Sequence, residues 1–157
     1  MKLKELKQEI EIPQGIDVLI EGNIVKIKGP KGENQRIFHY PKIKILKQEN
    51  KIILSAQNAT KKDKTMMGTI KSHIKNLIKG ADKGFIYKLK ICSGHFPMKV
   101  IIEGNNVLIN NFLGEKIPRK AKINLGVKVK IEGSEIILEG IDKELVAQSS
   151  ANIELAT

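Results

Sequence analysis

The 157-residue chain has no tryptophan, few other aromatic residues and a single cysteine. Aromatic side chains make up only 4% of it, so a buried core must be built from Ile, Leu and Val, which favour strands and buried helix faces. One cysteine, Cys92, excludes an internal disulfide. No apolar run approaches the roughly 20 residues of a membrane-spanning helix, and residues 1–11 do not resemble a secretory signal. We therefore expect a cytoplasmic protein with no membrane partner.

Acidic residues are also scarce relative to basic ones. The chain has 28 Lys and Arg against 17 Asp and Glu, a net charge of +11. Such an imbalance creates self-repulsion that a polyanion relieves, and nucleic acid is the commonest polyanion. Only Arg36 and Arg119 are arginines. Lysine suits contacts to phosphates and to structured RNA better than base reading in a duplex, and the chain lacks an aromatic platform for stacking single-stranded bases.

Residues with catalytic or metal-binding chemistry form no recognisable pattern. His39, His73 and His95 lie far apart, and Cys92 with His95 would need two further ligands to hold zinc. We interpret Cys92 as buried and His95 as a polar residue at a turn. Residues 29–32, GPKG, lack the full phosphate-binding loop pattern and are typical of a turn between strands. We expect no catalytic residue, no metal, no cofactor and no small-molecule substrate.

The chain contains an internal repeat. Residues 18–33 read VLIEGNIVKIKGPKGE and residues 100–115 read VIIEGNNVLINNFLGE, with identity at nine of sixteen positions and no gap. The offset of 82 residues is too long for a solenoid repeat and indicates a duplicated domain. We therefore predict an N-terminal repeat over residues 1–82 and a C-terminal repeat over residues 83–157.

Both copies show the same order of elements. Apolar and charged residues alternate, as in half-solvated strands, and Glu-Gly-Asn at 21–23 and at 103–105 predicts hairpin turns. A helix is predicted over residues 65–79, with Asp63 as its cap and Gly80 as its end, and a second over residues 142–156. Gly68 and Ala147 align, which suggests that helix and sheet approach closely there. The fold class is α+β: two tandem related domains, each an antiparallel β-sheet packed against one α-helix.

Basic residues gather in two stretches, residues 61–79 and residues 116–130. Residues 116–130 hold no acid and follow a tight segment at residues 110–114, and Pro118 interrupts regular structure within the basic stretch. Lysines on a loop beside glycine bring the backbone close to phosphates. The residues that we expect to bind RNA there are Asn110, Asn111, Gly114, Lys116, Arg119, Lys120 and Lys122, and elsewhere His95, Lys61, Lys62 and Lys64. For Lys71, Lys75 and Lys79, which share one helix face, we favour a solvated face.

Four motifs resemble the large-subunit ribosomal protein L6 family, in its archaeal and eukaryotic branch. They are GFIYKLK at residues 84–90, HFP at 95–97, NFLGEK at 111–116 and VAQSSANI at 146–153. The resemblance covers essentially the whole chain. It implies two related α+β domains and a structural, non-catalytic role. It also implies binding to large-subunit ribosomal RNA near the sarcin–ricin loop and the factor-binding region, chiefly through the second domain, beside proteins of the stalk base.

Three hypotheses follow from these patterns. The first is a structural protein of the large ribosomal subunit that binds its RNA. The second is an RNA-binding or RNA-chaperone module that acts outside the ribosome. The third is a small enzyme that uses Cys92 and His95.

Overall fold

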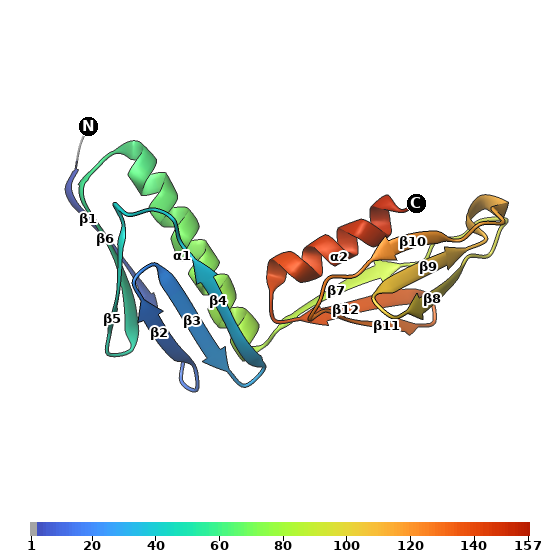
Figure 1. Ribbon diagram of the computed structural model, residues 1–157, viewed down its shortest axis with the longest axis horizontal. Helices are drawn as coiled ribbons and strands as arrows, with labels where there is room; N and C mark the ends of the chain where they lie inside the picture. Colours follow the sequence, from blue (N-terminus) through green and yellow to red (C-terminus); the bar gives the residue numbers. More distant parts are fainter. Residues whose placement is uncertain (1–2) are drawn as a thin grey trace. The chain divides into compact units, whose positions relative to one another are not determined.

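The computed structural model describes residues 3–157. The chain divides into two compact units, Met1–Lys83 and Gly84–Thr157. Each unit contains two three-stranded antiparallel sheets and one long helix (Figure 1).

In the first unit the two sheets have the strand orders β1-β6-β5 and β2-β3-β4. The strands are β1 (Leu3–Glu11), β2 (Asp17–Glu21), β3 (Ile24–Gly29), β4 (Gly32–Ile37), β5 (Lys44–Gln48) and β6 (Lys51–Ala59). The predicted turn at residues 21–23 is confirmed: Gly22 has a φ of 59° and joins β2 to β3. The alternation along β3 is also confirmed, since Val25 and Ile27 are buried and Lys28 is exposed.

Helix α1 (Lys61–Asp82) begins four residues before the predicted start. Its N-cap is Thr60, so the prediction that Asp63 is the cap was wrong. Asp63 occupies the third position of the helix and completes a capping box, in which the Thr60 N–H donates to its carboxylate at 2.7 Å. The predicted end at Gly80 was also wrong, because this glycine is buried inside the last turn and the helix continues to Asp82.

The core of the first unit is formed by the apolar stripe of α1 and the inner faces of both sheets. Met67, Ile70 and Ile74 are almost fully buried against strands such as β3 and β6. Helix and sheet approach closely at Gly29, where an added Cβ would lie 2.6 Å from the Ala81 carbonyl oxygen. The approach expected at Gly68 was wrong, because nothing lies within 4 Å of a Cβ built there.

In the second unit the strand orders are β10-β9-β8 and β11-β12-β7. The elements are β7 (Phe85–Lys90), β8 (Lys99–Glu103), β9 (Asn106–Asn110), the 3₁₀ turn η1 (Phe112–Gly114), β10 (Arg119–Lys122), β11 (Lys128–Glu132), β12 (Glu135–Gly140) and helix α2 (Lys143–Leu155). As predicted, Asp142 opens α2: its carboxylate accepts the N–H of Glu144 at 2.9 Å. Val146 and Ile153 are buried in the core that α2 shares with both sheets.

Within residues 3–157 no helix is both long enough and apolar enough to cross a membrane.

Candidate nucleic-acid interface

Two loops lie together at one end of the second unit, and we call them the tip loops: residues 91–98 and residues 111–118. The first connects β7 to β8 and the second connects β9 to β10 through η1. The Asn111 side-chain amide donates a hydrogen bond to the Pro97 carbonyl oxygen at 3.1 Å. The Phe96 ring packs against Gly114, where an added Cβ would lie 3.3 Å from a ring carbon. The two loops therefore support each other.

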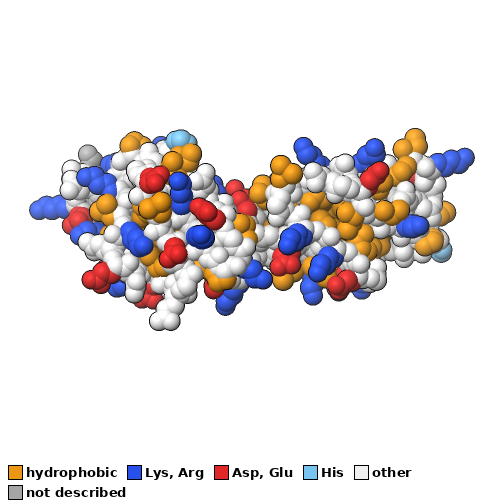
Figure 2. All heavy atoms as spheres, turned by 60° about the horizontal axis from the view of Figure 1, so that its bottom comes forward, with side chains coloured by type: hydrophobic (Ala, Val, Ile, Leu, Met, Phe, Trp, Pro, Cys, Tyr) orange, Lys and Arg blue, Asp and Glu red, His pale blue; other side chains and the backbone are white. Residues whose placement is uncertain are grey.

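The tip loops expose apolar and basic side chains side by side. Phe96 is 49% exposed, Leu113 71% and Ile117 80%, and Lys116 and His95 are also exposed. Figure 2 shows hydrophobic, lysine or arginine, and histidine side chains gathered at this end of the second unit.

The backbone of the second tip loop is strained. Asn111 has a φ of 59° and Leu113 a φ of 48°, both in the left-handed region. For a residue such as leucine this conformation costs roughly 1–2 kcal/mol. Strained residues persist where the surrounding structure holds them, and they concentrate at functional sites. Leu113 therefore combines a strained backbone with a large side chain exposed at the surface.

The predicted basic loop is in part a strand. Residues Arg119–Lys122 form β10, an edge strand that pairs with β9, so only Lys116 of the predicted cations lies on a loop. Pro118 is the last residue of the irregular segment, and β10 begins directly after it. Along β10 the buried Ala121 alternates with Lys120 and Lys122, which are both exposed. The acid-free run continues into Lys128 and Lys130, but these belong to β11 in the other sheet.

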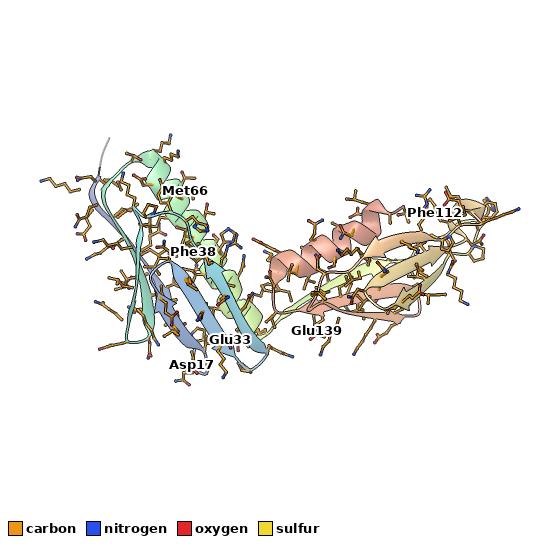
Figure 3. All side chains as sticks on the ribbon, viewed as in Figure 1. Asp17, Glu33, Phe38, Met66, Phe112 and Glu139 are labelled. Carbon is orange, nitrogen blue, oxygen red and sulfur yellow. The ribbon has the colours of Figure 1, made fainter. Side chains whose placement is uncertain are left out.

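Arg119 is engaged inside the protein. Its guanidinium donates to both carboxylate oxygens of Glu115, at 2.8 and 2.6 Å, and to the Ala156 carbonyl oxygen at 2.9 Å. It also lies 4.4 Å from the centroid of the Phe112 ring. Figure 3 labels Phe112 in the second unit. The hydrogen bond from Arg119 lowers the pKa of Glu115, and the same bond raises the pKa of Arg119. Arg119 therefore fastens the second tip loop to the end of α2.

The seven residues expected around this loop thus divide by environment. Asn111, Gly114 and Arg119 make contacts within the unit, as described above, and Asn110 is the half-buried last residue of β9. The side chains that project to solvent are those of Lys116, Lys120 and Lys122. The sequence did not reveal the partner of Arg119, because Glu115 lies just before the acid-free run and Ala156 is 37 residues away. Phe96 and Leu113 were missed because isolated apolar residues usually belong to a core.

Cys92 and His95 both lie in the first tip loop and both are exposed. The interpretation of Cys92 as buried was wrong, because residues 92–97 form an irregular exposed segment outside the strands. Among the residues that the structure describes, no group of three or more His, Cys, Asp or Glu side chains is placed to hold a metal ion.

The second group of predicted contacts lies on the first turn of α1. Lys61, Lys62 and Lys64 are all exposed, and the intervening Asp63 is only 3% exposed. The Asp63 carboxylate accepts hydrogen bonds from the Lys42 ammonium and, at 2.7 Å, from the Tyr40 hydroxyl. The pKa of Asp63 is held well below its usual range, chiefly by the hydrogen bond from Lys42 and then by those from the Thr60 backbone N–H and from Tyr40.

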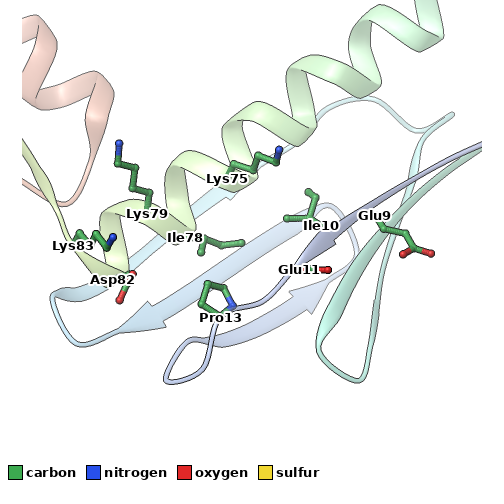
Figure 4. Close-up of a pocket in the computed structure, with 9 residues that line it drawn as sticks. All are labelled: Glu9, Ile10, Glu11, Pro13, Lys75, Ile78, Lys79, Asp82 and Lys83. Atoms are coloured by element: carbon green, nitrogen blue, oxygen red, sulfur yellow. The ribbon is translucent and has the colours of Figure 1, made fainter.

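A groove of about 550 Å³ runs between α1 and β1 in the same unit (Figure 4). Ile10, Ile78 and Pro13 contribute apolar surface to it. Its rim carries both signs of charge: Lys75, Lys79, Lys83 and Asp82 from the helix side, and Glu9 and Glu11 from β1.

The repeated arrangement of sheets and helix, together with the exposed cationic tip, defines a duplicated basic α+β protein. The family model for ribosomal protein L6 matches residues 12–84 and 96–157, one stretch in each unit. The chain belongs to the ribosomal protein L6 family, which confirms the predicted family and the predicted fold of two tandem related halves. As a member of a ribosomal protein family it is not an enzyme, so the hypothesis of catalysis by Cys92 and His95 was wrong.

Relatives from several archaea match nearly the whole chain, and each is named large ribosomal subunit protein uL6. The chain is 47% identical to the protein of Methanobrevibacter smithii, over 97% of this chain and 85% of the relative. It is 48% identical to that of Methanosarcina mazei, over 99% and 88%. It is 49% identical to that of Sulfurisphaera tokodaii, over 100% and 85%.

Proposed function

We propose that this protein is a structural constituent of the large ribosomal subunit and that it binds large-subunit ribosomal RNA near the sarcin–ricin loop and the factor-binding region. Its neighbours there are proteins near the stalk base. Family membership and the relatives' shared name support the ribosomal role. The single observation that carries the RNA contact is the end of the second unit, where exposed lysines lie beside two exposed loops, one of them strained.

The chemistry of this end suits a folded RNA. The ammonium groups of Lys116, Lys120 and Lys122 carry no ion pair within residues 3–157, so they are available to phosphates. Lysine contacts to phosphates release counterions and position a protein without reading sequence. The exposed Phe96 ring and Leu113 side chain add apolar surface that fits unstacked bases or sugar faces. The second unit is therefore the main RNA-binding unit in this proposal.

Reducing the charge of this end tests the proposal. We expect the full chain with Lys116, Lys120 and Lys122 all changed to Gln to bind a transcript of the sarcin–ricin region more weakly. Its plot of log affinity against log salt should flatten by roughly 0.7–0.9 units for each phosphate that the variant no longer binds. A control with Lys88, Lys128 and Lys130 changed to Gln removes the same charge from exposed strand positions on β7 and β11. Equal slopes for the two variants would contradict the proposed contact surface.

The alternative of an RNA chaperone outside the ribosome predicts a different distribution of the protein between ribosomal and ribosome-free fractions. A ribosomal constituent should sediment with large subunits after washing at moderate salt. Recovery of the protein only in the ribosome-free fraction would favour the alternative. Chemical footprinting of large-subunit RNA with and without the protein would locate the contact, and protection away from the sarcin–ricin loop would contradict the proposed position.

A further inference from the structure

Six lysines follow one side of α1 and its cap, and we call them the lysine face: Lys61, Lys64, Lys71, Lys75, Lys79 and Lys83. Successive members are three, seven, four, four and four residues apart, which keeps them on one side of an α-helix. The helix has 22 residues and is therefore roughly 33 Å long. The buried stripe of Met67, Ile70 and Ile74 faces the core. Every member of the lysine face is exposed except Lys71, which is half-buried.

The acids near the lysine face are mostly occupied elsewhere. Asp63 is buried and accepts from Lys42 and Tyr40, as described above. Across the groove of Figure 4, the Glu9 carboxylate pairs with Lys51 at 3.1 Å, and Glu11 also acts electrostatically on Lys51. Asp82 is the remaining acid of the helix.

Five of the six cations of the lysine face are correspondingly not neutralised by an ion pair. Within the part of the chain that the structure describes, five of its members form no ion pair: Lys61, Lys64, Lys71, Lys75 and Lys83. An array of like charges along one helix repels itself, and a linear polyanion laid against it removes that repulsion.

Helix α2 provides a comparison inside the same molecule. It occupies the equivalent place in the second repeat, yet it carries one lysine, Lys143, against Glu144 and Glu154. A basic helix is therefore not a requirement of the repeated fold. The lysine face is a property of the first unit alone, as the tip loops are of the second.

We propose that the lysine face of α1 binds the phosphate backbone of an RNA segment, as a contact separate from that of the tip loops. This inference rests on the proposed function and extends it, because it gives the first unit an RNA contact of its own. It replaces our interpretation of Lys71, Lys75 and Lys79 as a merely solvated face, and it joins them to the expected contacts Lys61 and Lys64. Lysines without arginine or an aromatic platform fit phosphate contact rather than base reading.

Directed hydroxyl-radical cleavage tests the inference in assembled large subunits. The chain's one cysteine, Cys92, lies exposed in the first tip loop and can carry an iron chelate that reports the RNA near the tip. In a second chain, Cys92→Ser with Ser72→Cys places the chelate in the middle of α1, on its exposed side. A third, Cys92→Ser with Gln48→Cys, places it at the exposed end of β5.

We expect position 72 to cleave large-subunit RNA strongly, at nucleotides different from those cleaved from Cys92, and position 48 to cleave much less. Cleavage from Cys92 but none from position 72 would overturn the inference and leave the proposed function intact. Absence of cleavage from all three positions in subunits that contain the protein would overturn both.

A binding measurement gives an independent test. We expect the full chain with Lys64, Lys71 and Lys75 changed to Gln to bind full-length large-subunit RNA with a flatter salt dependence. The slope should fall by roughly 0.7–0.9 units for each phosphate that these lysines bind in the parent chain. The matched control changes Lys4, Lys28 and Lys44, exposed lysines of the strands, to Gln. A slope unchanged from that of the control would overturn the inference, and a further flattening on adding the tip substitutions would support two separate contacts.

Discussion

Asp63 joins the first turn of α1 to the loop between β4 and β5. Its one carboxylate accepts the N–H of the N-cap Thr60 and holds Tyr40 and Lys42 of that loop. Because these donors favour the ionised form, the pKa of Asp63 is lowered in the folded protein. A lowered pKa stabilises the fold above the unfolded value of about 4, and the stabilisation is lost as the pH falls below that value.

We therefore expect Asp63→Asn to lower the free energy of unfolding at pH 7, and we expect the difference from the parent chain to shrink as the pH falls below about 4. Urea unfolding of both chains at pH 7 and at pH 3 measures this. Thr60→Ala serves as a control, because it removes the other half of the capping box at a cost of about 1 kcal/mol and changes no charge. A difference for Asp63→Asn of equal size at both pH values would contradict the assignment.

Arg119 makes a prediction for the second unit. Arg119→Gln removes the contacts to Glu115, Phe112 and the Ala156 carbonyl, so the second tip loop should open more often. We expect backbone amides of residues 112–116 to exchange with solvent roughly tenfold faster. Lys116→Gln in the same loop should leave their exchange unchanged, since Lys116 forms no ion pair within residues 3–157. Equal exchange in the parent and Arg119→Gln chains would show that the contacts do not hold the loop.

At the scale of residues, the sequence predicts where charge accumulates but not which charges are used internally. The exposure of Lys116, Lys120 and Lys122 could be predicted from the composition of their own stretch alone. The engagement of Arg119 depends on Ala156, which only the folding of α2 against β10 brings near. Likewise, Lys42 reaches Asp63 across 21 residues of sequence.

At the scale of elements, the packing of α1 depends on one glycine of a strand. An added Cβ at Gly29 would lie 2.6 Å from the Ala81 carbonyl oxygen and from the Ile16 side chain. The Lys31 N–H donates to the same carbonyl at 2.9 Å, so moving the helix away from the strand would break this hydrogen bond. We expect Gly29→Ala to lower the free energy of unfolding by about 1–3 kcal/mol.

Gly68→Ala is the matched control within the helix. Space is open at Gly68, so the alanine should raise the free energy of unfolding by about 0.5–1 kcal/mol through its better helix propensity. Denaturant titrations of the two variants beside the parent chain check both signs. Destabilisation by Gly68→Ala would instead support the close approach of helix and sheet that the alignment of Gly68 with Ala147 suggested.

The strands and hairpins could be predicted from the sequence because their information is local. Alternation of apolar and charged residues and a glycine or asparagine at each turn were sufficient for β2–β3 and for β8–β9. The start of α1 was placed late because Thr60 and Asp63 act as a pair, and either alone is compatible with a cap. In α2 the apolar side chains of Leu145 and Leu155 are 39% and 81% exposed. Ser149 is buried instead, and its hydroxyl accepts the N–H of Asn124 at 3.0 Å.

At the scale of the whole molecule, the two units have separate cores of different size. Among the described residues, the first core contains 18 buried apolar side chains and the second contains 8. A smaller apolar core contributes less to stability. The duplication thus preserved the order of elements without preserving the amount of apolar burial.

We expect residues 1–83 and 84–157, produced as separate polypeptides, each to unfold cooperatively, with the second fragment unfolding at the lower urea concentration. The second fragment should keep the salt-dependent RNA binding that depends on Lys116, Lys120 and Lys122. Circular dichroism during urea titration and an RNA-binding measurement on each fragment check this. Failure of both fragments to fold would show that the units depend on each other.

The engagement of Arg119 has a consequence for the speed of binding. A loop already fastened to α2 and to Glu115 needs little rearrangement when RNA arrives, so little conformational entropy remains to be lost on association. Encounter should then be limited by diffusion and by electrostatic attraction rather than by a slow folding step. The protein would reach its site on a growing ribosomal particle at a rate set by its lysines and by the salt around it.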